Sequence, residues 1–415
     1  MGLAAGDPPP DFAQYIAALI KQLYEVQQAP ETDPNLIRAY GAKLQEAIQD
    51  GYDAKLVDFA WDTPDYGMLA HLQNNSWQFS AAKTSDELKA LNDALIGPDG
   101  KINSFNEFRR QAEEITGRYL NWLKTEYQTA INGARMASKW QKIQRQKDIF
   151  PLLKFDAVID ERTSEICRPL NDIVKPVDDP FWDMYYPPNH FNCRSTVEQL
   201  RDGEATPDDE VQHPEKVPDM FKFNVGKKAI VFPPESSYYQ GLPKHLFNNA
   251  TLYMPEDEQY LIKYQAEDGT ELQVNRKTDI EQASDYKDLL TVGKVLANLG
   301  IEVDILPVIH ASEEDLRAEL LPGVKDGKNP DLRVDGEYAE VKAPVSATYG
   351  SIQKNIADAA KQADRVIILL DYLDKAALAR IAAERFRAID TLESIVFVSR
   401  DGEYEEFKKS TGANQ

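Results

Sequence analysis

The sequence predicts an α+β multidomain protein, with a helical N-terminal domain that carries a loop-rich lobe and an α/β domain with a central mixed sheet. Three observations predict this order. Apolar residues recur at three- and four-residue steps in the first 150 residues, and prolines, aspartates and aromatics gather at 155–201. From residue 250 onward, short strand-like runs alternate with helical ones.

Composition limits the classes of protein that the chain can represent. The 415 residues allow two or three domains, and 28% charged with 42% hydrophobic residues is typical of a soluble globular protein. The net charge of −22 excludes a general electrostatic footprint for nucleic acid, so such contact requires a local basic site. The start lacks the pattern of a secretory signal, and no apolar run is long enough to span a bilayer. With only two cysteines we expect a reduced, cytoplasmic origin and no disulfide framework.

Capping signals mark helix starts in the first region. Thr84 with Glu87, and Ser104 with Glu107, have the spacing of a capping box. No proline follows Ser104 until Pro151, so we expect one helix of roughly 40 residues, about 60 Å long at 1.5 Å per residue. Such a length suits an elongated assembly component better than a compact enzyme.

A change of composition predicts the domain boundary. The stretch 202–247 holds six of the chain's 24 prolines among polar runs such as "TPDDE" and "HPEKVPD". We therefore predict a proline-rich linker at 202–249, between a first domain at 1–201 and an α/β domain at 250–415.

The α/β domain is expected to contain its elements in a definite order. "YLIKYQAEDGTELQVN" predicts a hairpin that turns at Asp268-Gly269, and "DLLTVGKVLANLG" predicts a helix closed by Gly300. The strand "IEVDILPV", a second hairpin, the helix "GSIQKNIADAAKQA" and the strand "RVIILLD" follow. A helix from about Asp374 to Ala388 and a last strand, "SIVFVS", complete the domain.

Several short segments within residues 71–201 resemble the sequences of one family. "LQNNSWQFSAAKTSDEL", "EFRRQAEEITGRYLNWLKTEYQTAINGARMASKW", "DERTSEICRPLND" and "PPNHFNCRST" resemble the phage Mu-type minor head protein (head morphogenesis) family, and "FNVGKKAIVF" at 223–232 matches a segment that often follows. The resemblance covers roughly the first 235 residues. It implies a minor capsid protein of the virion, present in the host cytoplasm during assembly, with the phage portal and capsid proteins as partners.

Two cysteines and a histidine in this region form a candidate metal site. Thiolates and imidazole suit Zn²⁺, so Cys167, His190 and Cys193 are three candidate ligands, and a structural site needs a fourth. The candidates for that fourth ligand are Asp160, Asp172 and His213. The alternative is a packed turn, pinned by Pro187-Pro188, whose buried thiols act as small hydrophobes.

The end of this motif departs from the family that it resembles. Many members end it in Cys-Arg-Cys, whereas Ser195 follows Arg194 here. We expect Arg162 and Arg194 to anchor the loop-rich lobe to carboxylates or main-chain carbonyls, not to contact DNA.

The second hairpin, "NPDLRVDGEYAEVKAP", concentrates charge. If Asp335-Gly336 is a two-residue type I′ turn, Asp331 lies opposite Glu340, roughly 5 Å apart at Cβ. Alternation then places five residues on one face: Asp331, Arg333, Tyr338, Glu340 and Lys342. Because two facing carboxylates repel, they predict a divalent cation such as Mg²⁺ between them.

This pattern resembles the PD-(D/E)xK nuclease superfamily and, more closely, the C-terminal nuclease domains of contact-dependent inhibition toxins, including tRNA nucleases. The resembling words are Pro330-Asp331, "DG", "EVKAP" and "QAD", within roughly residues 285–405. The resemblance implies metal-dependent cleavage of phosphodiester bonds in a nucleic acid, either RNA such as tRNA or DNA. It also implies an immunity protein as a partner. The implied catalytic residues are Asp331, Glu340, Lys342 and Gln362, with Mg²⁺ or another divalent cation held by the first two.

Three points stay open at this level. Asp288 is the nearest candidate for the acidic residue that the superfamily carries on a preceding helix. A metal-independent ribonuclease would instead use Tyr338, Lys342 and a histidine. A purely structural, portal-associated head protein would leave the hairpin as an ordinary polar face.

Overall fold

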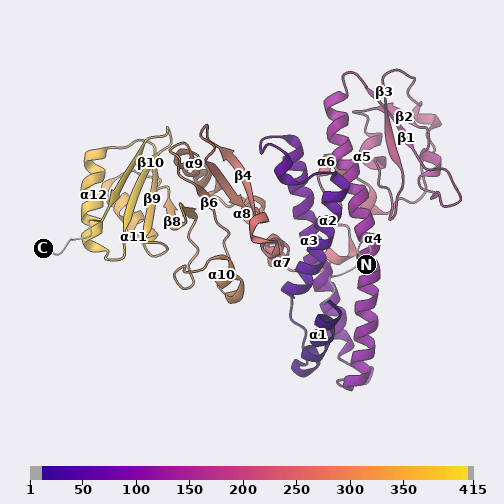
Figure 1. Ribbon diagram of the computed structural model, residues 1–415, viewed down its shortest axis with the longest axis horizontal. Coiled ribbons are helices and arrows are strands. Elements are labelled where there is room, and N and C mark those ends of the chain that lie inside the picture. The colour runs from indigo at the N-terminus through magenta and orange to yellow at the C-terminus, as the bar shows by residue number, and fades with distance from the viewer. Residues whose placement is uncertain (1–11, 312, 410–415) are drawn as a thin grey trace. The chain divides into compact units, whose positions relative to one another are not determined.

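The structure is a computed structural model that describes residues 12–311 and 313–409 (Figure 1). The first eleven residues, on which the expected absence of a secretory signal depends, lie outside this range. The chain forms two compact units, Met1–Met254 and Pro255–Gln415. Each has its own hydrophobic core, so the α+β multidomain class predicted from the sequence is confirmed. No helix in the described part is both long and apolar enough to cross a membrane.

Long helices form the body of the first unit. They are α1 (Phe12–Val26), α2 (Pro34–Tyr52), α3 (Pro64–Ala94) and α4 (Phe105–Gln146), with a short 3₁₀ turn, η1 (Leu56–Asp58). The 42 residues of α4 confirm the expected long helix, and the Ser104 hydroxyl caps it by accepting from the Glu107 N–H at 3.3 Å. The capping box expected at Thr84 and Glu87 is wrong. Both residues are buried inside α3, where Glu87 accepts a hydrogen bond from Tyr40 of another helix.

The loop-rich lobe follows α4. Its antiparallel sheet has the order β2-β1-β3, and its elements are β1 (Leu152–Asp156), η2 (Arg168–Leu170), β2 (Val174–Pro176), α5 (Phe181–Tyr185) and β3 (Thr196–Leu200). Several hydrogen bonds fix the lobe to α4. The Tyr186 hydroxyl donates to the Met136 carbonyl at 2.9 Å, and Asn132 donates to the Cys193 carbonyl at 2.9 Å.

The segment 202–249 does not form the spacer that its prolines predict. Asn75 of α3 bonds to the backbone of this segment through both ends of its amide: it accepts from Val231 and Phe232 at 2.9 and 2.8 Å and donates to the Phe232 carbonyl at 2.8 Å. The Phe232 ring stacks on Phe79, with centroids 3.9 Å apart. The prolines separate short turns whose apolar residues are buried, so the segment belongs to the first unit.

The short elements of this segment continue to the end of the unit. They are η3 (Asp208–Glu210), η4 (Asp219–Phe221), α6 (Val225–Lys228), η5 (Ser237–Tyr239), α7 (Lys244–Asn249) and η6 (Ala250–Tyr253). The boundary between the two units therefore lies at 254/255.

An eight-stranded mixed sheet in the order β11-β10-β9-β8-β7-β6-β5-β4 organises the second unit. The strands are β4 (Tyr260–Gln265), β5 (Glu271–Asn275), β6 (Val303–Ile305), β7 (Leu332–Val334), β8 (Glu337–Lys342), β9 (Arg365–Leu370), β10 (Ser394–Ser399) and β11 (Tyr404–Lys408). The pairs β5/β6, β8/β9 and β9/β10 are parallel and the others antiparallel. The expected central mixed sheet is confirmed.

Helices cover both faces of this sheet. The helical elements are η7 (Glu256–Glu258), α8 (Arg276–Glu281), α9 (Tyr286–Ala297), α10 (Glu314–Leu320), α11 (Tyr349–Ala359) and α12 (Lys375–Ala388). Ile367 and Leu369 of β9 join the core beneath α9, while Val366 and Ile368 join the core beneath α11 and α12. This alternation buries β9 on both sides, as its continuous apolar sequence requires.

Candidate functional site

The charged hairpin has the register expected from its sequence. Val334 pairs with Glu337, and Leu332 pairs with Ala339. The turn residues Asp335 and Gly336 have φ angles of 48° and 84°, the positive values that a type I′ turn requires. The hairpin therefore places Asp331, one residue before β7, beside the strand that carries Glu340 and Lys342.

These three side chains meet at the end of the hairpin. Asp331 Oδ2 accepts a hydrogen bond from the Val341 N–H at 2.8 Å, which fixes this carboxylate against β8. Lys342 Nζ forms an ion pair with Glu340 Oε1. The Glu340 side chain is only 3% exposed and that of Lys342 is 34% exposed, so the lysine links a buried acid to the surface. Within the described residues, Glu340 Oε2 has no hydrogen-bond partner.

Burial and mutual repulsion set the charge of this group. Burial raises the pKa of Asp331. Burial first, and the Asp331 charge second, raise the pKa of Glu340 to about 7. Burial opposes the charged form of Lys342, but the hydrogen bond and charge of Glu340 outweigh it, so the pKa of this lysine is raised. Two carboxyls that both resist ionisation beside a charged lysine fit the donor set of a hard divalent cation.

An acidic residue that the sequence analysis missed stands near this group. Asp285, at the start of α9, is close enough for its charge to act on both Asp331 and Lys342. Asp288, the residue expected in this role, instead pairs with Arg400 at 2.8 Å. The position of Asp285 directly before a helical pattern is the signal that could have identified it.

Gln362 occupies a different place. It lines a cavity of about 280 Å³ together with Lys325, Tyr338 and Arg365, and neither Glu340 nor Lys342 lines that cavity. Its Oε1 atom is buried, with no hydrogen-bond partner among the residues that the structure describes. Gln362 is thus part of a neighbouring polar cavity.

The Tyr338 hydroxyl forms a hydrogen bond within the structure. Its hydroxyl donates to the Pro322 carbonyl at 3.0 Å, which ties the loop after α10 to the sheet. This contact gives Tyr338 a structural role.

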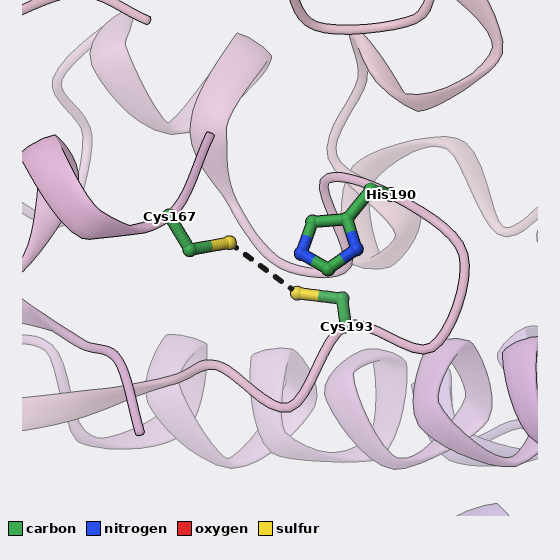
Figure 2. Close-up of side chains that lie close together, drawn as sticks. All are labelled: Cys167, His190 and Cys193. Atoms are coloured by element: carbon green, nitrogen blue, oxygen red, sulfur yellow. Dashed lines mark hydrogen bonds between the residues drawn. The ribbon is translucent and has the colours of Figure 1, made fainter. Parts of the chain in front are cut away.

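Cys167, His190 and Cys193 converge in the lobe of the first unit, as Figure 2 shows. Their candidate ligand atoms all lie within 4.8 Å of one another, and the two Sγ atoms are 3.7 Å apart. Tetrahedral zinc with Zn–S bonds of about 2.3 Å would place two sulfurs about 3.8 Å apart. The spacing therefore fits two thiolates on one zinc ion.

Hydrogen bonds prepare these groups to act as ligands. His190 Nδ1 lies 2.7 Å from the Phe191 carbonyl oxygen, so Nδ1 carries the proton and Nε2 is the candidate ligand atom. The hydrogen bond with Cys167 lowers the pKa of Cys193 to about 4, against its burial, and His190 acts in the same direction. The same pairing raises the pKa of Cys167. One thiolate is thus favoured before any metal is bound.

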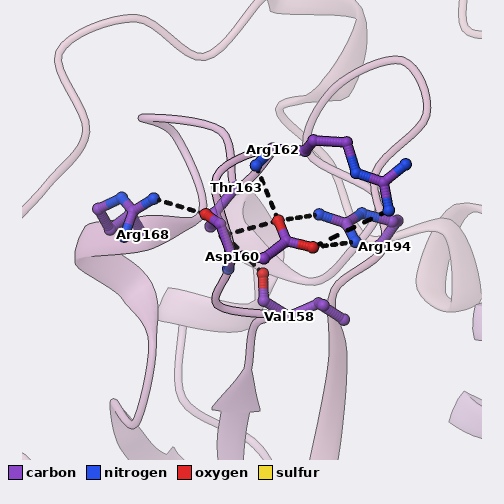
Figure 3. A network of polar contacts seen from close by, with 6 residues as sticks. All are labelled: Val158, Asp160, Arg162, Thr163, Arg168 and Arg194. Atoms are coloured by element: carbon purple, nitrogen blue, oxygen red, sulfur yellow. Dashed lines mark hydrogen bonds and ion pairs between the residues drawn. The ribbon is translucent and has the colours of Figure 1, made fainter.

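None of the three expected fourth ligands joins this cluster. Asp160 accepts two hydrogen bonds from the Arg194 guanidinium, at 2.8 and 2.6 Å, and one from the Arg162 N–H at 2.8 Å (Figure 3). Asp172 accepts from the adjacent Asn171 at 2.8 Å, and His213 Nδ1 lies 3.1 Å from the Tyr185 hydroxyl. All three are committed elsewhere.

The Asp160 network shows what the arginines of the lobe do. Arg194 binds the Asp160 carboxylate, and Arg168 donates to the Asp160 carbonyl at 3.0 Å (Figure 3). The expected anchoring role is confirmed for Arg194. The Arg162 guanidinium is 81% exposed and reaches the same carboxylate only at 4.0 Å, so its anchor is its backbone N–H.

Two family models match separate parts of the chain. Residues 86–198 match the family described as Phage Mu protein F like protein. Residues 328–404 match the family described as Contact-dependent growth inhibition CdiA C-terminal domain. The chain thus contains a segment similar to phage Mu protein F and, after it, a segment similar to the CdiA C-terminal domain, as the two resemblances predicted. The second match contains the charged hairpin.

Two curated relatives are similar to a part of the chain. The "Putative capsid assembly protein F" of Escherichia phage Mu is 35% identical over 89 residues, 21% of this chain and 20% of the relative. The Mu-like prophage FluMu F protein of Haemophilus influenzae is 36% identical over 78 residues, 19% of this chain and 18% of the relative. The match therefore spans about a fifth of each relative's length.

One solved structure resembles part of the chain. The CdiA-CT/CdiI toxin and immunity complex from Burkholderia pseudomallei is 20% identical, with 31% of this chain and 88% of that chain covered. The TM-score is 0.24, so the superposition itself carries no argument about function.

Proposed function

We propose that this chain is a phage minor head protein whose second unit is a toxin-like, metal-dependent nuclease. The observation that carries the nuclease proposal is the Asp331–Glu340 carboxyl pair beside the part-exposed ammonium of Lys342, with one buried Glu340 oxygen unpartnered. The family match over 328–404 supports it.

Each charged residue of the hairpin has its own proposed role. Asp331 and Glu340 would hold a divalent cation such as Mg²⁺, which supplies Lewis-acid stabilisation of charge on a phosphate when bound. Lys342 keeps its proton because Glu340 is beside it, and its exposed ammonium can bind a non-bridging phosphate oxygen. Asp331 is held in place by the Val341 N–H, so the pair is preorganised. Gln362, in the adjacent cavity, would contact the substrate farther from the scissile bond.

A cleavage assay on the full chain tests this function. We expect RNA, with tRNA as the first substrate to test, to be cut in Mg²⁺ and left intact in EDTA. Single-stranded and duplex DNA run beside it identify the substrate class. Cleavage that survives EDTA would favour a metal-independent ribonuclease. No cleavage of any substrate would favour the structural head protein with a non-catalytic second unit.

We propose that the first unit acts in capsid assembly. The Mu F-like match over 86–198 and the name of the Mu relative support this role. It makes the portal and capsid proteins the expected partners and the virion the expected location, after assembly in the host cytoplasm. Particles purified from a producing strain should contain the chain, and an antibody should co-precipitate it with the portal. The match to a growth-inhibition toxin family further predicts an immunity protein that blocks the nuclease.

We also propose that Cys167, His190 and Cys193 bind zinc. The 3.7 Å separation of the two sulfurs and the Nδ1 contact of His190 support this assignment. Purified protein should contain about one equivalent of zinc, and Cys193→Ser should remove it. Metal analysis that finds none in protein purified without chelators would leave the packed turn as the better description.

A further inference from the structure

The zinc cluster has three protein ligands where a closed structural site has four. Among the described residues, the group whose ligand atoms lie within 4.8 Å of one another comprises Cys167, His190 and Cys193 and no further His, Cys, Asp or Glu. The carboxylates and the histidine expected from the sequence are engaged elsewhere. The fourth position must therefore be supplied by something other than these residue types.

Two serine hydroxyls border the cluster. Ser195 and Ser164 both lie within hydrogen-bonding reach of Cys167 Sγ. Ser164 also accepts from the Ile166 N–H at 2.9 Å, which holds its hydroxyl within its own turn. The segment that carries Ser195 is fixed on both sides, because Asn132 donates to the Cys193 carbonyl at 2.9 Å and Lys139 donates to the Thr196 hydroxyl at 2.8 Å.

We propose that the zinc centre is an open one, with three protein ligands and a water molecule in the fourth position next to the Ser195 hydroxyl. This inference rests on the zinc proposal and adds the identity of the missing ligand. A neutral serine hydroxyl is a poor zinc ligand compared with a thiolate, but it can hydrogen-bond to a coordinated water. An open position makes the metal exchangeable and accessible to an external ligand.

Replacement of single serines tests this geometry. Ser195→Cys adds a thiolate next to Cys167 and should close the site, so we expect zinc transfer to a chromophoric chelator to slow by at least about tenfold. Ser164→Cys is the matched control: it also adds a sulfur within reach of Cys167, but in a turn held by Ile166. We expect it to change the transfer rate by less than about twofold.

Cobalt substitution gives a readout that is independent of stability. The Co²⁺ form of the wild type should show charge transfer from two thiolates, and that of Ser195→Cys from three. Added imidazole should change the Co²⁺ spectrum of the wild type by replacing water, and leave Ser195→Cys unchanged.

The outcomes separate the two proposals. If the wild type binds neither Zn²⁺ nor Co²⁺, the zinc assignment itself fails. If it binds Co²⁺ but does not respond to imidazole, or if Ser195→Cys gains no third sulfur bond, the open-site inference is overturned and the zinc assignment stands. Circular dichroism of each variant confirms that the comparison is made on folded protein.

Discussion

Each unit of the molecule places a lysine beside carboxylates, and the two groups use the same residue types differently. In the first unit, Lys83 lies 2.9 Å from Glu126 and over the rings of Tyr40 and Tyr238, at 5.3 and 5.2 Å from their centroids. Tyr40 donates to Glu87 at 2.6 Å, and Tyr238 donates to Glu126 at 3.0 Å. This Lys83 cluster joins α2, α3, α4 and η5, and its lysine side chain is 0% exposed.

Each unit contains a glutamate with a pKa of about 7, and the causes of the two raised pKa values differ. Burial raises the pKa of Glu87 to about 7, while the Tyr40 hydroxyl and the Lys83 charge oppose that rise. For Glu340, burial and the neighbouring Asp331 both act upward to reach about 7, and Lys342 opposes them. A perturbed pKa therefore does not by itself identify a catalytic acid. The distinction is that a neighbouring carboxylate is the second-largest cause of the raised pKa at Glu340 but only a minor one at Glu87, and that Lys342, unlike Lys83, reaches solvent.

The largest expected effect is on cleavage by the second unit. Asp331→Asn and Glu340→Gln should each reduce cleavage by about 10³-fold or more, because either change removes half of the proposed metal-binding pair. Lys342→Met should be comparably inactive yet still bind metal, since its ammonium acts on the phosphate. Single-turnover assays and Mg²⁺ or Mn²⁺ titrations measure the two properties.

A control on the same hairpin makes this test specific. Glu337 is 73% exposed, and its carboxylate pairs only loosely with Arg365 at 3.9 Å. Glu337→Gln should keep wild-type activity within about twofold, as a surface substitution does. Equal activity in the wild type and all four variants would refute the assignment of the pair.

The Lys83 cluster should respond in stability and not in activity. Lys83→Met leaves two buried glutamates without their cation, and we expect the first unit to lose about 3–5 kcal/mol of unfolding free energy. All five tryptophans precede residue 255, so their fluorescence during urea unfolding reports on this unit alone. Lys89→Met, at an exposed position of the same helix, should cost less than about 0.5 kcal/mol. A loss of nuclease activity in Lys83→Met at temperatures where the variant is folded would contradict the expectation that the Lys83 cluster affects stability and not activity.

The pH dependence of the first unit should depend on Glu87. The folded protein holds this proton up to about pH 7, whereas an unfolded chain releases it near pH 4.3. The stabilisation is therefore complete below about pH 4.3 and is lost as pH rises through 7, by roughly 3–4 kcal/mol. Urea unfolding at a series of pH values should show this decline, and Glu87→Gln should flatten it. An unchanged slope in Glu87→Gln would assign the decline to another group.

Features that depend on local interactions could be predicted from local sequence signals. Ser104 and an unbroken apolar period sufficed for α4, and the Asp335-Gly336 turn fixed the register that brings Asp331 to Glu340. The sequence analysis was wrong where long-range packing determines the structure. The proline content of 202–249 does not reveal that Asn75, 157 residues before Phe232, binds its backbone.

The smallest predicted effect separates two acids three residues apart. Asp285 acts electrostatically on Asp331 and Lys342, whereas Asp288 is held by Arg400 at 2.8 Å. If Asp285 helps to hold the cation or a metal-bound water, Asp285→Asn should lower cleavage about tenfold and raise the Mg²⁺ concentration needed for half-maximal activity. Asp288→Asn breaks only a surface ion pair, so it should change activity by less than about twofold and stability by less than about 1 kcal/mol. A larger loss of cleavage in Asp288→Asn than in Asp285→Asn would assign the role near the metal to Asp288, the residue that the sequence analysis expected. It would also mean that the ion pair between Asp288 and Arg400 opens when the cation binds.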